Sequence, residues 1–260
     1  MIKLLHTELL KLKTYPLFWV STVLFAGFIP LLFAFFLRAD FQINDQDMDL
    51  FQFLAPNASS LWQYLMFVAS YGVYILVLFL LSYTNRDLTN GIWRQYIIEG
   101  VSRNQLVSGR IIIAGAVALL AMFLLFVMGV YTIAQKEYSG IVVSLWELRT
   151  FFACFGLYLF SFMMMALVLN AIVNSTILSF LGIFFWSLFV EGVVRWIDPS
   201  TLSHYLPVYN FNRLIPNPVS ALIGGESLSA TPEIRHVIIS VVWTAAFIAF
   251  LYGIYRRRDF

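Results

Sequence analysis

Charge and cysteine are the two features that this 260-residue sequence has least of. Only 12% of its residues are Asp, Glu, Lys or Arg, whereas 61% are hydrophobic and 18% are aromatic. A soluble domain needs a largely polar surface, so this composition excludes one and is typical of a polytopic membrane protein. The single cysteine, Cys154, excludes an intrachain disulfide and a cysteine-based zinc cluster.

Motifs for nucleotide binding and for metal or nucleophilic chemistry are also missing. The chain has no G-x-x-x-x-G-K-[ST] phosphate-binding loop, so it does not bind nucleotide in that manner. The three histidines are His6, His204 and His236, and none lies within helical reach of another histidine or of the cysteine. We therefore predict no metal site, no directly bound cofactor and no catalytic residue.

Long apolar runs separated by polar segments give the chain its organisation. Each of the runs is about 20 residues long, the length that a helix needs to cross the hydrocarbon core of a bilayer. The runs cover residues 17–37, 61–83, 111–134, 150–173, 177–197 and 237–255. The sequence therefore predicts an all-α fold with six transmembrane helices in a single domain, residues 1–260.

Two polar segments are expected to lie along the membrane surface. Residues 1–15 place apolar side chains on one helical face and lysines on the other, which predicts a cytoplasmic amphipathic helix. The outer segment 198–236 holds five of the eight prolines, and its stretches 202–209 and 219–223 are apolar enough to re-enter the membrane surface. We predict re-entrant helices there, just before the sixth span.

The polar segment 84–110 is the most informative part of the sequence. Its first half has one apolar face at helical spacing, formed by Leu88, Ile92 and Tyr96, with Trp93 and Ile97 alongside. Gly100 follows where a helix C-terminus favours a left-handed residue. Ser102 and Gln105 then form a capping-box pattern. We predict a short amphipathic helix on the membrane surface, followed by a sharp turn into the third span.

Lysine and arginine are divided unevenly between the two sides that six spans would create. The N-terminus, the segment 84–110 and the C-terminus together hold 10 Lys and Arg against 4 Asp and Glu, whereas the other side holds 6 against 10. Basic residues favour the cytoplasmic side of a membrane protein. We therefore predict a multi-pass protein of the cell membrane, with both termini and the segment 84–110 in the cytoplasm.

Ionisable side chains are almost absent from the predicted spans. A transporter coupled to ions needs a group near the midplane whose charge changes. Only Glu191 and Arg195 interrupt an apolar run, as an i,i+4 pair in the outer half of the fifth span. Two interpretations stand: an ion pair that fixes the depth of the helix, or a gate or substrate contact near the outer leaflet. In either case, energy for transport would come from a partner.

Two stretches resemble the permease subunit of type-2 ABC exporters, the family that includes bacteriocin-immunity and antibiotic-export permeases. Residues 3–19 read KLLHTELLKLKTYPLFW and are similar to that family's connecting helix. Residues 90–111 read NGIWRQYIIEGVSRNQLVSGRI and resemble its coupling-helix region, where a Ser-Arg turn precedes the third span. The long segment before the sixth span resembles the outward re-entrant helices of the family.

The resemblance implies a permease that moves a hydrophobic or amphipathic substrate such as a lipid, peptide or drug. ATP and Mg²⁺ would be bound by a separate ABC ATPase subunit, and a second permease copy or homologue would complete the pathway among the membrane lipids, with no nucleic-acid partner. The coupling-helix residues that would bind the ATPase are Asp87, Asn90, Gly91, Arg94, Gln95, Glu99, Gly100, Ser102 and Arg103. Two alternatives stay open from the residues alone: an intramembrane enzyme, and a membrane scaffold or assembly factor.

Overall fold

The computed structural model describes most of the chain. It describes residues 8, 10–37, 41–43, 46–48, 58–135, 145–198, 202–215, 217 and 232–257. Residues 1–7 of the predicted N-terminal helix and the predicted re-entrant stretch 219–223 lie outside these residues. Residues 10–14 are helical, and Tyr15 separates them from the first long helix.

Helices make up nearly all of the described elements, in agreement with the predicted all-α class. The elements are α2 (Pro16–Leu37), β1 (Phe41–Ile43), β2 (Gln46–Met48), α4 (Ala58–Tyr71), α5 (Val73–Thr89), α6 (Ile92–Ile98), α7 (Arg103–Gln135), α8 (Leu145–Val173), α9 (Thr176–Phe185), the π-helix η1 (Trp186–Val190), α10 (Glu191–Ile197), the 3-10 helix η2 (Leu202–Tyr205), α11 (Pro207–Arg213) and α13 (Ile234–Arg257).

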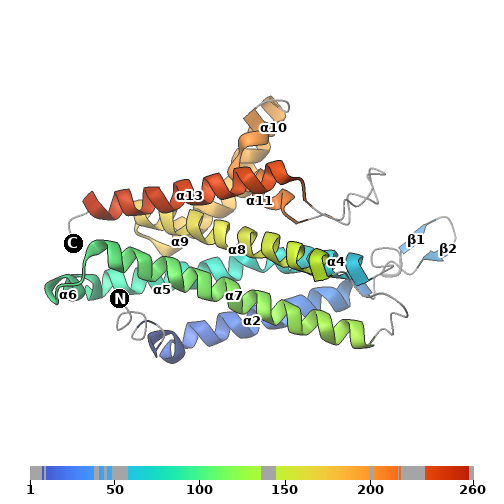
Figure 1. Ribbon diagram of the computed structural model, residues 1–260, viewed down its shortest axis with the longest axis horizontal. Helices are drawn as coiled ribbons and strands as arrows, with labels where there is room; N and C mark the ends of the chain where they lie inside the picture. The colour runs from blue at the N-terminus through green and yellow to red at the C-terminus, as the bar shows by residue number, and fades with distance from the viewer. Residues whose placement is uncertain are drawn as a thin grey trace.

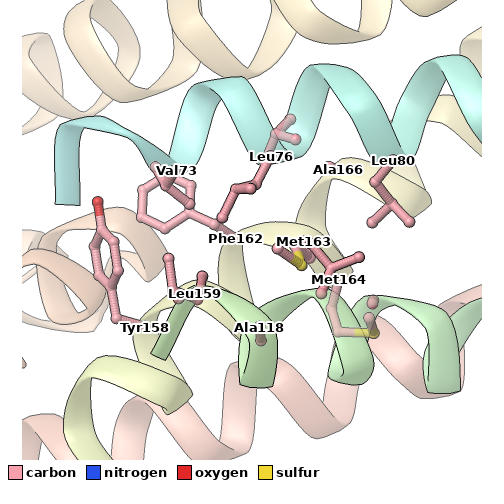
Figure 2. Close-up of a cluster of buried hydrophobic side chains, with 14 of the residues drawn as sticks. Val73, Leu76, Leu80, Ala118, Tyr158, Leu159, Phe162, Met163, Met164 and Ala166 are labelled. Carbon is pink, nitrogen blue, oxygen red and sulfur yellow. The ribbon is translucent and has the colours of Figure 1, made fainter. Parts of the chain in front are cut away.

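Helix α8 is the centre of the bundle. It packs against α4, α5, α7, α9, α11 and α13, and Figure 1 shows the long helices running side by side around it. Because α8 is surrounded, 67% of its most apolar stretch is buried, against 17% for α13. Figure 2 shows part of this core, where Phe162 and Met163 of α8 lie between Leu76 of α5 and Ala118 of α7.

Several helices are long and apolar enough to cross a membrane. Among the described residues these are α7, α8, the continuous stretch from α9 to α10, and α13. Helices α4 and α5 meet at a bend of 40° and make a fifth span if the pair is taken together, while Pro16–Leu32 is a shorter apolar helix. The chain is therefore a multi-pass membrane protein, and the count of six spans stays a prediction.

The break between α4 and α5 is a difference from the sequence prediction, which had one unbroken span over 61–83. Gly72 lies at the break. A Cβ atom on Gly72 would lie 2.7 Å from the ring of Phe25, which is fully buried on α2. Glycine at this position therefore allows α2 to pack closely against the bent pair.

Different elements lie at the two ends of the bundle. The start of α2, the end of α13 and α6 lie at one end, and the β1–β2 hairpin lies at the other (Figure 1). The strands pair antiparallel, with Phe41 opposite Met48, in the polar segment between the first two apolar runs. Between α8 and α9 the chain turns tightly, because Asn174 has a φ of 57° and the Ser175 hydroxyl accepts from the Leu178 N–H that opens α9.

Candidate functional site

Helix α6 lies between two glycines with left-handed backbone conformations. Gly91 has a φ of 68° and Gly100 a φ of 90°, a region that residues with a Cβ rarely adopt. The Val101 N–H donates to the Tyr96 carbonyl at 2.9 Å, and the Gly100 N–H donates to the Ile97 carbonyl at 3.0 Å. These two bonds form a Schellman motif, so the predicted role of Gly100 is confirmed.

The start of α7 has the predicted capping box. The Ser102 N–H donates to the side-chain oxygen of Gln105 at 3.0 Å, and the Gln105 N–H donates to the Ser102 hydroxyl at 3.4 Å. Each residue thus satisfies a backbone donor of the other. The chain passes from α6 into α7 through a turn that is hydrogen-bonded on both sides.

The apolar face predicted for one helix is divided between two. Helix α5 continues to Thr89, and Gly91 precedes the first residue of α6. Leu88 therefore belongs to α5, whereas Ile92 and Tyr96 belong to α6. Leu88 and Tyr96 are partly buried and pack against the core, so these two side chains of the face point toward the bundle even though the helix is broken.

The two faces of α6 differ in exposure. Trp93 is 1% exposed, and its ring centre lies 4.8 Å from that of Tyr255 on α13. The exposed side chains of α6 are Arg94, Gln95 and Ile98, and the flanking exposed positions are Asn90, Glu99, Gly100 and Ser102. Most of the predicted ATPase-binding residues thus lie on one accessible surface, which we call the α6 surface.

Two of the predicted site residues are engaged within the chain instead. Arg103 is half-buried and donates to the main-chain carbonyl of Arg256, at the end of α13, at 2.9 Å. Asp87 is buried and pairs with Arg110 of α7. These two side chains hold the ends of α13 and α5 to the start of α7.

A cluster of four charged side chains, three of them buried and Lys11 partly exposed, lies beside α6, and we call it the buried charge cluster. Arg110 donates to the carboxylate of Glu8 at 3.2 Å and to that of Asp87. The Lys11 ammonium lies 3.3 Å from the Glu8 carboxylate and 3.7 Å from that of Asp87. The Tyr83 hydroxyl also donates to Glu8, at 2.7 Å. The cluster therefore joins the N-terminal helix, α5 and α7.

Every charge in this cluster has an opposite partner. Glu8, Asp87 and Arg110 are each 4% exposed, and buried charges are tolerated only when they are paired and hydrogen-bonded. Burial by itself lowers the pKa of Lys11, but its contact with Tyr96 and the charges of Glu8 and Asp87 outweigh burial and raise the pKa above its ordinary value. Lys11 therefore keeps its positive charge.

Sequence reasoning missed this cluster and assigned Glu8 and Arg110 only to the cytoplasmic charge count. The one clue to the cluster in the sequence was the position of these two residues. Glu8 is the single acid in residues 1–15, and Arg110 is the last charge before the apolar run 111–134. A charge at such a boundary is unfavourable unless it is paired, but the spacing alone does not say with which residue.

Glu191 has partners other than the predicted one. Its carboxylate accepts from the Val208 N–H at 2.8 Å, the Tyr209 N–H at 2.6 Å and the Trp186 indole N–H at 3.1 Å. Arg195 donates to the main-chain carbonyl of Glu191 at 3.3 Å, and no ion pair joins the two side chains in this described part of the chain. Glu191 is 1% exposed and acts as a cap for the first turn of α11.

Helix α11 is also held by its own side chains. The Asn210 amide donates to the carbonyls of His204 and Leu206 at 2.9 and 2.6 Å, and its oxygen lies 2.8 Å from Nδ1 of His236 on α13. The predicted re-entrant stretch 202–209 thus contains η2 and the start of α11. Within the described ranges, no three His, Cys, Asp or Glu side chains lie close enough to hold a metal ion.

The apolar helices define a multi-pass membrane protein built around a helical bundle. The chain matches the family model of ABC-2 family transporter proteins over residues 4–190, and it therefore belongs to this family. It is a permease, the membrane subunit of an ABC transporter, and membership implies an ABC ATPase as its partner. The match includes α6 and the buried charge cluster and ends directly before Glu191. No curated protein matches the chain.

Proposed function

We propose that this permease belongs to an ATP-driven exporter and that α6 is the helix on which a separate ATPase subunit acts. The observation that carries the proposal is the α6 surface. Ile98 is 85% exposed on it, between the exposed charges of Arg94 and Glu99. An apolar side chain within a polar rim is the arrangement found in protein–protein interfaces. Trp93 supports the proposal from the opposite face, because its burial fixes α6 on the bundle.

The contacts around α6 support a route for movement from this surface into the membrane. The Schellman motif at Gly100 and the capping box at Ser102 leave no flexible linker between α6 and α7. Arg103 and Trp93 contact the end of α13. A displacement of α6 by the ATPase would therefore move α7 and α13 together, and the buried charge cluster would carry α5 and the N-terminal helix with them.

The proposed topology has six spans, formed by α2, the bent pair α4–α5, α7, α8, the stretch from α9 to α10, and α13. The N-terminal end of α2 and the C-terminal end of α13 lie at the same end of the bundle as α6 (Figure 1), which agrees with an even number of spans. The excess of lysine and arginine at that end favours its placement in the cytoplasm. Helix α11, capped by Glu191, is then the re-entrant helix of the outer side.

The proposed transport pathway lies between two permeases. Only 17% of the most apolar part of the stretch from α9 to α10 is buried within one chain, and the stretch exposes large apolar side chains including Leu181, Phe185 and Phe189. A second permease and the lipid chains would together cover such a surface. We propose that the substrate is hydrophobic or amphipathic, and that ATP and Mg²⁺ are bound on the ATPase alone.

The test is to purify the tagged permease from its own membrane and to identify its partners by mass spectrometry. We expect a protein with a G-x-x-x-x-G-K-[ST] motif in an amount equal to that of the permease, and ATP hydrolysis by the complex. A folded permease that purifies with no ATPase would contradict the proposal.

A further inference from the structure

A cavity of about 220 Å³ opens between the N-terminal helix and α5. Its walls include Lys11, Tyr15, Arg86, Asp87 and Asn90. We propose that this cavity binds a phosphate group, carried by an anionic phospholipid headgroup or free in solution. The site is separate from the transport pathway proposed above and is inferred from the residues that line the cavity and from their neighbours.

Arg86 provides the main recognition group. Its guanidinium lies 5.0 Å from the centre of the Tyr15 ring, and the side chain is exposed and has no carboxylate within 4 Å among the described residues. Stacking on an aromatic ring holds the guanidinium plane in place and leaves its N–H edge for an oxyanion. Arginine in this arrangement favours the bidentate hydrogen bonds that phosphate oxygens accept.

The charge balance of the cavity favours an anion with a single charge. Asp87 lines the cavity, but Arg110, which does not line it, pairs with both Asp87 and Glu8, and Lys11 lies close to the same two carboxylates. Two cations thus balance two carboxylates, and Arg86 remains as the extra positive charge. A phosphodiester carries one negative charge, so its binding would bring the group to neutrality.

The position of the cavity along the chain favours a lipid as the carrier of that phosphate. The cavity borders Tyr15, directly before the apolar helix α2, and the Trp19 indole N–H donates to the Lys13 carbonyl at 2.9 Å. Tyrosine and tryptophan mark the level of lipid headgroups. Beyond that level α2 exposes Val20, Val23 and Leu24, along which acyl chains would lie. Basic sites between helices at such a boundary bind anionic headgroups.

The proposal predicts a local consequence for α6. Arg86 and Asn90 belong to the last turn of α5 and its C-cap, and Gly91 follows directly. A phosphate held between Arg86 and the N-terminal helix would fix the end of α5, and with it the start of α6.

The test measures lipid retention by native mass spectrometry on the purified full chain, with phosphatidylglycerol or phosphatidylcholine added to the micelles. We expect selective retention of phosphatidylglycerol. Arg86→Gln should weaken that retention about fivefold, whereas Arg86→Lys should keep most of it. Arg94→Gln is the matched control, because it removes an exposed arginine of α6 that does not line the cavity.

Inorganic phosphate, added as a competitor, distinguishes the two carriers. If inorganic phosphate displaces phosphatidylglycerol, the cavity binds free phosphate as well as the lipid headgroup. If it does not, the cavity binds the phosphate group only as part of a lipid. The proposal would be overturned if Arg86→Gln and Arg94→Gln lost phosphatidylglycerol to the same extent. It would also be overturned if the wild type retained both lipids equally and inorganic phosphate had no effect on that retention. Neither result depends on an ATPase, so failure here is distinct from failure of the proposed function.

Discussion

Arg110 of α7 donates a hydrogen bond of 3.2 Å to the carboxylate of Glu8, which lies 102 positions earlier in the N-terminal helix. Both side chains are 4% exposed, so neither carries its charge in water. The pair fixes the N-terminal helix against α7 at the level of α6. It makes the helical segment that contains Glu8 part of the same structural unit as the proposed coupling helix.

Removal of the arginine should therefore be strongly destabilising. Arg110→Met leaves the carboxylates of Glu8 and Asp87 buried without their main partner, and we expect the free energy of unfolding to fall by about 3–5 kcal/mol. Thermal unfolding of the detergent-purified protein measures the effect. The triple variant Arg110→Met, Glu8→Gln and Asp87→Asn removes all three charges and should recover most of the loss. If Arg110→Met unfolds at the wild-type temperature, the buried network is not formed.

The cap on α11 predicts an unequal effect of two neighbouring substitutions. Glu191→Ala removes the acceptor of the Val208 and Tyr209 N–H groups, and each buried donor left unpaired costs about 1–3 kcal/mol. We expect faster hydrogen exchange at these two amides, measured by mass spectrometry of the α11 peptide. Arg195→Ala is the control and should leave that exchange unchanged. A comparable increase in Arg195→Ala would instead favour the Glu191–Arg195 ion pair that the sequence suggested.

Close packing of α4 against α7 predicts that one methyl group added at this contact lowers the stability of the protein. A Cβ atom on Gly129 of α7 would lie 2.2 Å from the ring of Trp62, which is 2% exposed on α4. Gly129→Ala should therefore destabilise the protein by about 1–3 kcal/mol through overpacking. Gly182→Ala is the matched control, because a Cβ there meets no atom within 4 Å, and it should be neutral or stabilising. Equal melting temperatures of the two variants would contradict the packing described here.

Features that depend on neighbouring residues could be predicted from the sequence. Gly100 ends α6 and Ser102 begins α7 through hydrogen bonds that reach no further than five positions along the chain, so the local pattern contains all the information. The apolar runs likewise located the long helices, because the length of a span is set by the thickness of the bilayer. The family resemblance rested mainly on residues 3–19 and 90–111, and the match over residues 4–190 confirms the family.

Features that depend on distant residues could not be predicted. Glu191 looks like half of an i,i+4 pair, but its partners lie 17 and 18 positions further on, in a helix whose position only the fold determines. The bend at Gly72 depends in the same way on the ring of Phe25 from another helix. A hydropathy pattern records which residues avoid water, but it does not record which buried groups meet.

The central claim, that a separate ATPase acts on α6, is tested by changing its exposed face alone. The double variant Arg94→Glu and Ile98→Asp alters two side chains that are exposed to solvent, so the permease should fold normally. Arg103 is left unchanged, because its hydrogen bond to the Arg256 carbonyl holds α13. The matched control is Ile234→Asp with Arg235→Glu, which makes the same kinds of change at exposed positions at the opposite end of the bundle.

The decisive measurement is the amount of ATPase recovered with each tagged permease, relative to the amount of folded permease. We predict that the α6 double variant retains its yield and melting temperature but recovers about tenfold less ATPase, because exposed charges contribute little to folding yet strongly affect the choice of partner. The control variant should recover as much ATPase as the wild type. Undiminished recovery with the α6 double variant would contradict the claim and place the contact elsewhere on the permease.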